Sequence, residues 1–163
     1  MSTDKLQIVC QKLISGGQTG VDRGALDACL ENSFTCGGWC PKGRLAEDGT
    51  IDKKYPLHET EEDDYTMRTI KNVETADGTL IIAPENITGG TLFTYEIAKK
   101  KNKPVLIFTP EPADNSLKLS SIVDWLISNS IKTLNAAGPR ESQWPEAYTK
   151  SRRLVGELLR LIQ

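Results

Sequence analysis

Apolar and polar positions follow one another along this chain in two different rhythms. Short apolar runs are separated by longer segments in which apolar residues recur every three or four positions. The first rhythm is typical of buried strands and the second of amphipathic helices, so their alternation predicts an α/β protein with a mostly parallel sheet. The expected strands are Lys12–Ser15, Phe34–Trp39, Gly78–Ala83, Pro104–Phe108 and Lys132–Ala136. The expected helices are Val21–Asn32, Asp64–Glu74, Thr91–Lys101, Leu117–Asn129 and Glu146–Ile162.

The segment 41–63 departs from both rhythms. It reads PKGRLAEDGTIDKKYPLHETEED, with a high charge density and no clear periodicity. A stretch of about twenty residues without regular structure is uncommon inside a compact domain and often has a function. We therefore interpret it as a lid or an oligomer arm, with a flexible surface loop as the alternative.

The length of 163 residues suffices for one domain with a substantial core, so residues 1–163 are expected to fold as a single unit. The formal net charge of −2 gives no basic footprint and argues against a nucleic-acid partner. No apolar run is long enough to span a bilayer, and the first residues lack the features of a signal peptide. We therefore expect no membrane association and a cytoplasmic location.

The four cysteines, Cys10, Cys29, Cys36 and Cys40, are expected to be free thiols, because disulfide frameworks are rare in cytosolic proteins. Cys36 and Cys40 are separated by three residues rather than the two of a zinc knuckle. The only histidine, His58, lies far along the chain. The sequence therefore predicts no metal held by protein ligands.

The turn after the first expected strand, SGGQTGVDR, is the first candidate binding segment. Gly16, Gly17 and Gly20 allow a tight turn and a close approach of the backbone to a ligand. Amides at a helix N-terminus attract an anion, and Thr19 is the expected N-cap of this helix. The polar residues expected to support the site are Gln18, Asp22, which would cap the helix or contact a ribose or pterin, and Arg23. A tight turn without a ligand is the alternative.

A second glycine turn, TGGT, opens the helix that follows the third expected strand. Gly89, Gly90 and Thr91 would present amides to an anion in the same way, with Thr94 nearby. Glu96 lies in the first two turns of this helix, where it would balance the helix dipole or act as a general base or ribose ligand. Ligands of parallel α/β sheets bind outside the carboxyl ends of the strands, so the two turns predict one shared site.

Other residues, most of them cationic or polar, also lie where they could reach this site. They are Lys42, Arg44, Arg68, Asn72, Gly138, Arg140 and Ser142. Lys42 and Arg44 follow the second strand, and Ser142, after the fifth, is the expected N-cap of the last helix. Ordinary surface charge is the alternative for Lys42 and Arg44, and a solvated stripe on one helical face is the alternative for Arg68 and Asn72.

The sequence offers no clear pairing of a nucleophile with a base. One histidine leaves little from which to build a Ser–His or Cys–His pair. Neither glycine turn continues as the Gly-Lys-Ser/Thr of a P-loop. These residues favour binding of an anionic ligand over covalent catalysis.

Six segments together resemble the molybdenum-cofactor carrier family. They run from about Leu13 to Ser142 and read SGGQTGVDRGALDAC, GGWCPKGRLAEDGTI, YPLHET, RTIKNVETADGTLII, GGTLFTYEIA and AAGPRES. The resemblance implies a single Rossmann-like three-layer domain, with about five mostly parallel strands and helices on both faces. It also implies a binding or carrier protein for a phosphorylated pterin- or nucleotide-like ligand, foremost the molybdenum cofactor, and assembly as a homodimer or homotetramer.

This family is grouped with the "lonely guy" phosphoribohydrolases, often called lysine decarboxylases, and with DNA-processing protein A. In the phosphoribohydrolases a PGGxGTxxE motif binds the nucleotide phosphate and supplies a catalytic glutamate. The similar stretch here is TGGTLFTYE, in which Gly89, Gly90 and Glu96 match the motif and Thr88 replaces its proline. The alternative functions are therefore cleavage of nucleoside-monophosphate N-glycosidic bonds by Glu96, and a nucleotide-ligand sensor that regulates a partner protein.

The order of these motifs predicts the order of the strands. The first two expected strands are similar to the second and third strands of those enzymes, and TLNAAGPRES near the end takes the place of their first. In this chain's numbering the sheet order would then be 2-1-5-3-4. Arg140 would lie between the two glycine turns.

Overall fold

The computed structural model describes residues 10–112 and 115–163. Its main sheet contains β1 (Lys12–Ile14), β2 (Cys36–Gly37), β7 (Gly78–Ile82), β8 (Val105–Phe108) and β9 (Thr133–Ala137). The helices are α1 (Val21–Glu31), α2 (Tyr65–Thr75), α3 (Gly89–Lys100), α4 (Ser116–Ser128) and α5 (Ala147–Ile162). Outside the main sheet, β3 (Trp39–Cys40) pairs with β6 (His58–Glu59), and β4 (Leu45–Ala46) pairs with β5 (Gly49–Thr50).

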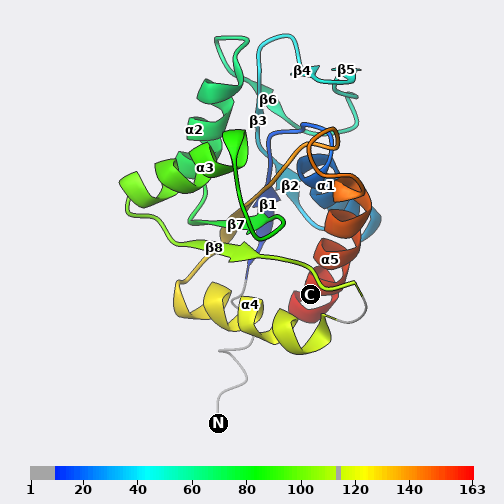
Figure 1. Ribbon diagram of the computed structural model, residues 1–163, viewed down its shortest axis with the longest axis vertical. Coiled ribbons are helices and arrows are strands. Elements are labelled where there is room, and N and C mark those ends of the chain that lie inside the picture. The colour runs from blue at the N-terminus through cyan, green and yellow to red at the C-terminus, as the bar shows by residue number, and fades with distance from the viewer. Residues whose placement is uncertain (1–9, 113–114) are drawn as a thin grey trace.

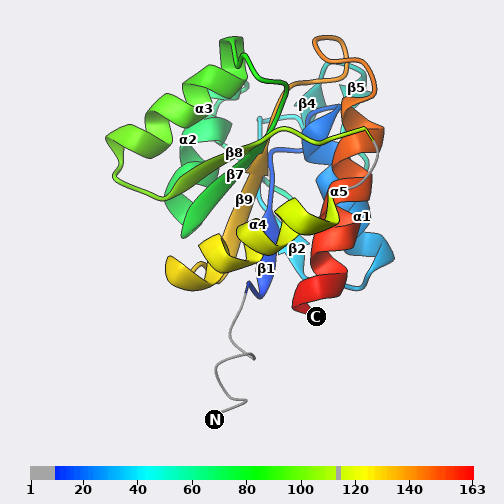
Figure 2. The same cartoon turned by 60° about the horizontal axis from the view of Figure 1, so that its bottom comes forward.

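The elements form three layers, with the parallel sheet in the middle. Helices α1, α4 and α5 cover one face, and α2 and α3 cover the other (Figures 1 and 2). The centre of the sheet is buried, since all five residues of β7 are inaccessible to solvent. The predicted α/β fold with helices on both faces is confirmed.

The strand order of the main sheet is β2-β1-β9-β7-β8, with every neighbouring pair parallel. This is the predicted order 2-1-5-3-4, which is therefore confirmed. The last strand of the chain lies between the first and the third, with Leu13 opposite Leu134 and Leu80 opposite Ala136. Asn135, the buried polar residue of this central strand, donates to the Thr79 hydroxyl at 3.3 Å.

The second strand differs from its prediction, because Phe34–Trp39 is not one continuous strand. Residues 36–37 pair with β1, whereas Trp39 and Cys40 pair with β6 in a separate small sheet. The break lies at Gly38, whose φ is 132° and whose Cβ, if present, would lie 2.0 Å from the Ser15 carbonyl oxygen. The chain therefore leaves the main sheet where only a glycine can pass so close to β1.

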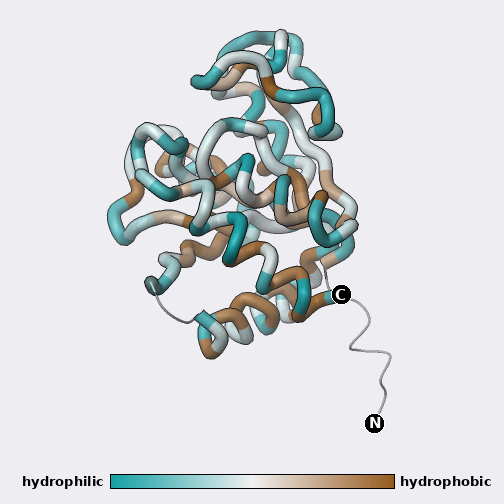
Figure 3. Tube along the Cα trace, turned by 90° about the vertical axis from the view of Figure 1, so that its right-hand side faces the viewer, coloured by the Kyte–Doolittle hydropathy of each residue, from teal (hydrophilic) through white to brown (hydrophobic). Residues whose placement is uncertain are grey.

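The segment 41–63 forms an ordered lobe, which contains the β4–β5 hairpin and β6. Its centre is the Arg44 guanidinium, which donates to four main-chain carbonyls, those of Ile51, Asp52, Tyr55 and Leu57. The Tyr55 hydroxyl donates to Asp27 of α1 at 2.6 Å and fixes the lobe to the domain. Figure 3 shows a mostly hydrophilic trace through this lobe at the top of the molecule. The prediction of a segment without regular structure is corrected, because internal hydrogen bonds replace apolar periodicity here.

The described residues also bear on the expectations about cysteines and membranes. All four cysteines are free thiols, as predicted, and burial raises the pKa of Cys10 to about 11. Among the described residues, no helix combines the length and the apolar character needed to cross a bilayer.

Candidate functional site

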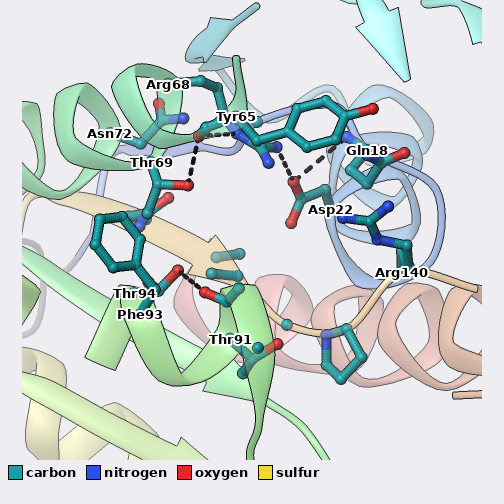
Figure 4. A pocket seen from close by; sticks show the side chains of 18 of the residues that line it. Gln18, Asp22, Tyr65, Arg68, Thr69, Asn72, Thr91, Phe93, Thr94 and Arg140 are labelled. Atoms are coloured by element: carbon teal, nitrogen blue, oxygen red, sulfur yellow. Dashed lines mark hydrogen bonds and ion pairs between the residues drawn. The ribbon is translucent and has the colours of Figure 1, made fainter. Parts of the chain in front are cut away.

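A cleft of about 310 Å³ lies at the carboxyl ends of β1 and β9, where α2 and the start of α3 complete its walls (Figure 4). This volume falls at the lower end of the range typical for small-molecule sites. The cleft brings together eleven of the residues predicted as ligand-binding. They are Gly16, Gln18, Asp22, Arg68, Asn72, Gly89, Gly90, Thr91, Thr94, Gly138 and Arg140.

Two arginines from different elements lie over one aromatic ring in this cleft. The guanidinium carbon of Arg68 is 5.2 Å from the centre of the Tyr65 ring, and that of Arg140 is 5.3 Å away. Such cation–π contacts hold both positive charges beside a flat apolar surface. Sequence reasoning missed Tyr65, although it lies three residues before Arg68 on the same helical face. It also missed Phe93 of α3, whose side chain lies in the cleft wall (Figure 4).

The floor of the cleft holds a buried ion pair. Nη1 of Arg68 lies 3.2 Å from Oδ2 of Asp22, and the two side chains are 11% and 9% exposed. Burial raises the pKa of Asp22, whereas the nearby Arg68 charge and the backbone N–H of Gln18 oppose that rise. Gly16 makes room for this pair, since a Cβ at that position would lie 2.2 Å from Nη1 of Arg68. Asp22 is thus held in place by Arg68 and is a hydrogen-bond acceptor at the cleft floor.

Asn72 lines the cleft, but its amide has a structural task. Its Oδ1 accepts from the Trp39 backbone N–H, and its Nδ2 donates to the Trp39 carbonyl, both at 2.9 Å. The side chain therefore pairs with the start of β3 as a neighbouring strand would. This pairing anchors α2 against the segment that leaves the main sheet.

The first glycine turn uses its amides within the protein. The N–H groups of Gln18, Thr19 and Val21 donate to Asp22, to the Gln18 side chain and to the Pro139 carbonyl, respectively. The expected N-cap role of Thr19 is corrected, because the N-cap residue of α1 is Gly20. A glycine has no side chain with which to cap the helix. Gly20 instead allows contact between two turns, since a Cβ there would lie 2.5 Å from the Pro139 oxygen.

The second glycine turn is open. A Cβ at Gly89 or Gly90 would meet no atom of the described residues within 4 Å. Thr88, the N-cap of α3, makes no side-chain cap hydrogen bond within the described chain. The first N–H groups of a helix lack intrahelical partners and carry its positive dipole end, so this N-terminus suits an anion. The N-terminus of α3 therefore has more open space around its glycines than that of α1.

Eight predicted residues lie outside the set that lines the cleft. They are Gly17, Thr19, Gly20, Arg23, Lys42, Arg44, Glu96 and Ser142. The prediction that Lys42 and Arg44 reach the pocket is corrected. Arg44 is engaged by carbonyls of its own lobe, and Lys42 is exposed after the chain has left the main sheet at Gly38.

Arg23 and Ser142 are paired with the acidic tip of the β4–β5 hairpin. Arg23 lies 2.5 Å from Asp48, and the Ser142 hydroxyl donates to Glu47 at 2.6 Å. Ser142 is not the N-cap of α5. The N-cap of α5 is Glu146, and the Glu141 carboxylate accepts from the backbone N–H groups of Glu146 and Tyr148 at 2.8 and 2.9 Å. The carboxylate reaches two donors, which the shorter serine hydroxyl does not.

Glu96 is exposed on α3 and does not line the cleft. Its predicted catalytic role stays a prediction that the geometry does not favour. In the described part of the chain, no group of three or more His, Cys, Asp or Glu residues has the arrangement to hold a metal ion.

The sequence matches the family model described as the circularly permutated YpsA SLOG family over residues 13–159. The chain belongs to this family. The permutation in the family's name agrees with the sheet order, in which the last strand, β9, occupies a central position.

One solved structure extends the comparison of this YpsA SLOG family member. It is a crystal structure described as "Putative molybdenum carrier protein" from Syntrophus aciditrophicus SB. The two chains are 40% identical with a TM-score of 0.85, and the match covers 94% of this chain and 95% of the other. No curated protein matches the chain. The family and this neighbour confirm the resemblance drawn from the sequence motifs.

Proposed function

We propose that this protein binds and carries a phosphorylated pterin- or nucleotide-like ligand in the cleft, with the molybdenum cofactor as the specific candidate. The observation that carries the proposal is the open N-terminus of α3, which faces the same cleft as Arg68 and Arg140. A helix N-terminus and two guanidinium groups together attract a phosphate-bearing ligand. The name of the Syntrophus neighbour supports the carrier role.

The residues of the cleft fit the parts of such a ligand. The terminal phosphate would bind at Gly89, Gly90 and Thr91, where the missing Cβ atoms leave room for its oxygens. The planar ring would lie against the aromatic wall of Tyr65 and Phe93. The pterin-bearing ligand would also find an acceptor for a ring N–H in the Asp22 carboxylate.

The proposed role is to hold the ligand rather than to break it. Glu96, the glutamate of the hydrolytic alternative, lies on the exposed side of α3. Incubation with a panel of nucleoside monophosphates, followed by chromatography, should release no free base. Base release that disappears in Glu96→Gln would establish the hydrolytic alternative instead.

The test is equilibrium binding of isolated molybdenum cofactor, read by molybdenum content after gel filtration and by the fluorescence of the oxidised pterin. Arg140→Ala and Gly90→Ala should each weaken binding by about tenfold or more, because each removes or blocks a contact to an anionic group. Arg160→Ala is the matched control, since Arg160 is exposed on α5 and does not line the cleft. It should leave binding unchanged.

Two results would contradict the proposal at different levels. Absence of cofactor binding, with adenosine 5′-monophosphate still bound through Arg140, would exclude the molybdenum cofactor but keep a phosphorylated ligand. Absence of binding to both compounds would exclude the ligand class. The expected homodimer or homotetramer stays a prediction, which sedimentation velocity would check.

A further inference from the structure

The tip of the β4–β5 hairpin carries an acidic group that is bound like a ligand. The Glu47 carboxylate accepts from the Ser142 hydroxyl at 2.6 Å, from the Ser142 backbone N–H at 3.2 Å and from the Thr19 hydroxyl. Nη1 of Arg140 lies 3.9 Å from the same carboxylate. These donors come from the turns after β1 and β9, far from Glu47 in sequence.

The groups around Glu47 form a donor set suited to an oxyanion. Two hydroxyls, one backbone amide and one guanidinium converge on a single carboxylate. Partial burial raises the pKa of Glu47, but the hydrogen bonds from Ser142 and Thr19 and the charge of Arg140 outweigh it and keep the pKa below its usual value. The environment therefore favours a negative charge at this position.

Gln18 connects this donor set to the cleft. Its Oε1 accepts from the backbone N–H groups of Thr19 at 3.0 Å and Glu47 at 2.8 Å, which fixes the orientation of the amide. Its Nε2 is buried without a hydrogen-bond partner among the described residues, although Gln18 is only 5% exposed and lines the cleft. An unpaired buried donor is costly, and a ligand acceptor in the cleft would satisfy it.

The hairpin tip is held mainly by contacts of two side chains, whereas the rest of its lobe is packed and hydrogen-bonded. Ile51, Tyr55 and Leu57 are buried, and the Arg44 hydrogen bonds hold the lobe below the tip. The two hairpin strands are only two residues long each. Beyond them the tip is held by the contacts of Glu47 and by the pairing of Asp48, whose side chain is 51% exposed, with Arg23.

We propose that Thr19, Ser142 and Arg140 form a second anion subsite, which Glu47 occupies until the ligand displaces it. This inference rests on the proposed function, because the cleft must first bind a phosphorylated ligand. The second group is a tetrahedral oxyanion with two negative charges, such as a phosphate. The Glu47 carboxylate leaves with the hairpin tip and becomes solvated, while Nε2 of Gln18 donates to the ligand. A tip that is closed ten times more often than open lowers the apparent affinity about tenfold.

The experiment compares two probes that differ by one phosphate, adenosine 5′-monophosphate and adenosine 3′,5′-bisphosphate, by isothermal titration calorimetry. Glu47→Ala should bind the bisphosphate about tenfold more tightly than the natural protein and the monophosphate equally well. Glu31→Ala is the matched control, because it removes the same charge from the end of α1, where Glu31 pairs with Arg152. It should change neither affinity.

A second substitution tests the subsite itself. Adding Ser142→Ala to Glu47→Ala should abolish the gain for the bisphosphate, and Glu47→Gln should show part of it. A bisphosphate affinity that is unchanged or weaker in Glu47→Ala, with monophosphate binding intact, would overturn the second subsite and leave the proposed function standing. If neither nucleotide binds any variant, the proposed function fails for nucleotides. Binding of inorganic phosphate, measured by ³¹P line broadening, then tests the second subsite. Phosphate binding to Glu47→Ala that is lost when Ser142→Ala is added would support the subsite, and absence of phosphate binding to Glu47→Ala would overturn it.

Discussion

Replacing Arg68 with methionine removes one half of the buried ion pair at the floor of the cleft. At 3.2 Å and an effective dielectric constant of about 20, the two charges attract each other by about 5 kcal/mol before desolvation. Loss of one partner from a buried pair typically costs about 3–5 kcal/mol, since the remaining charge is left unpaired. We expect Arg68→Met to lower the free energy of unfolding by that amount at neutral pH.

The same substitution has a predictable pH dependence. Burial already raises the pKa of Asp22, and removing Arg68 takes away the largest influence that opposes the rise. The folded variant therefore holds the Asp22 proton more tightly than the unfolded chain does. Its stability is greatest below the usual pKa of an aspartate and is lost as the pH rises through the raised value. The deficit relative to the natural protein should therefore shrink on acidification.

Urea unfolding, followed by tryptophan fluorescence and far-UV circular dichroism at about pH 5 and about pH 7.5, measures both effects. The control is the double variant Asp22→Asn/Arg68→Met, which removes both charges and should recover at least about half of the lost stability. A cost below about 1 kcal/mol for Arg68→Met would refute the reasoning, because it is the value of an exposed pair. Equal stabilities of the single and double variants would refute it as well.

Three further predictions follow from other contacts. Gly20→Ala should destabilise the protein by about 1–3 kcal/mol, because a Cβ would strike the Pro139 carbonyl at a φ of 80°, whereas Gly90→Ala should leave the melting temperature unchanged. Tyr55→Phe should cost about 1 kcal/mol and increase limited proteolysis within 41–63, because it breaks the 2.6 Å bond that fixes the lobe. The hydrogen bond from Arg23 lowers the pKa of Asp48, so this carboxylate stabilises the fold above its usual pKa and loses that effect as the pH falls through the lowered value. Carboxyl NMR titration of Arg23→Gln should show the pKa return to its usual value.

The fold was predictable because the periodicity of apolar residues indicates where the strands and helices lie. The buried run Gly78–Ile82 and the amphipathic helix Ala147–Ile162 carry their apolar residues in patterns that the core requires. The break at Gly38 was not predictable, since it depends on the approach of Ser15 from another strand. A local pattern carries no information about such a contact.

The cleft was predicted better than the tasks of its residues. Glycine turns and cations predicted a shared site at the carboxyl ends of the strands, and the structure has a cleft there, because parallel strands bring their carboxyl ends together. The sequence did not distinguish Gly20, which serves a contact between turns, from Gly90, which faces open space. The sequence also predicted that Arg44 binds the ligand, whereas the Arg44 guanidinium donates to main-chain carbonyls and holds its own lobe together. Every residue has a main-chain carbonyl, so the sequence does not indicate which carbonyls an arginine will bind.

The central position of β9 has a consequence for how the chain is made. A ribosome releases β1, β2, β7 and β8 first, as two pairs that have no shared partner until Thr133–Ala137 emerges. Until then β1 and β7 each present an unpaired edge, which is the kind of surface on which incomplete chains associate with one another. Leu13 of β1, for example, has no partner on this side until Leu134 of β9 has been synthesised. The sheet therefore closes late in synthesis, and a nascent chain halted before β9 would expose both strand edges to other chains.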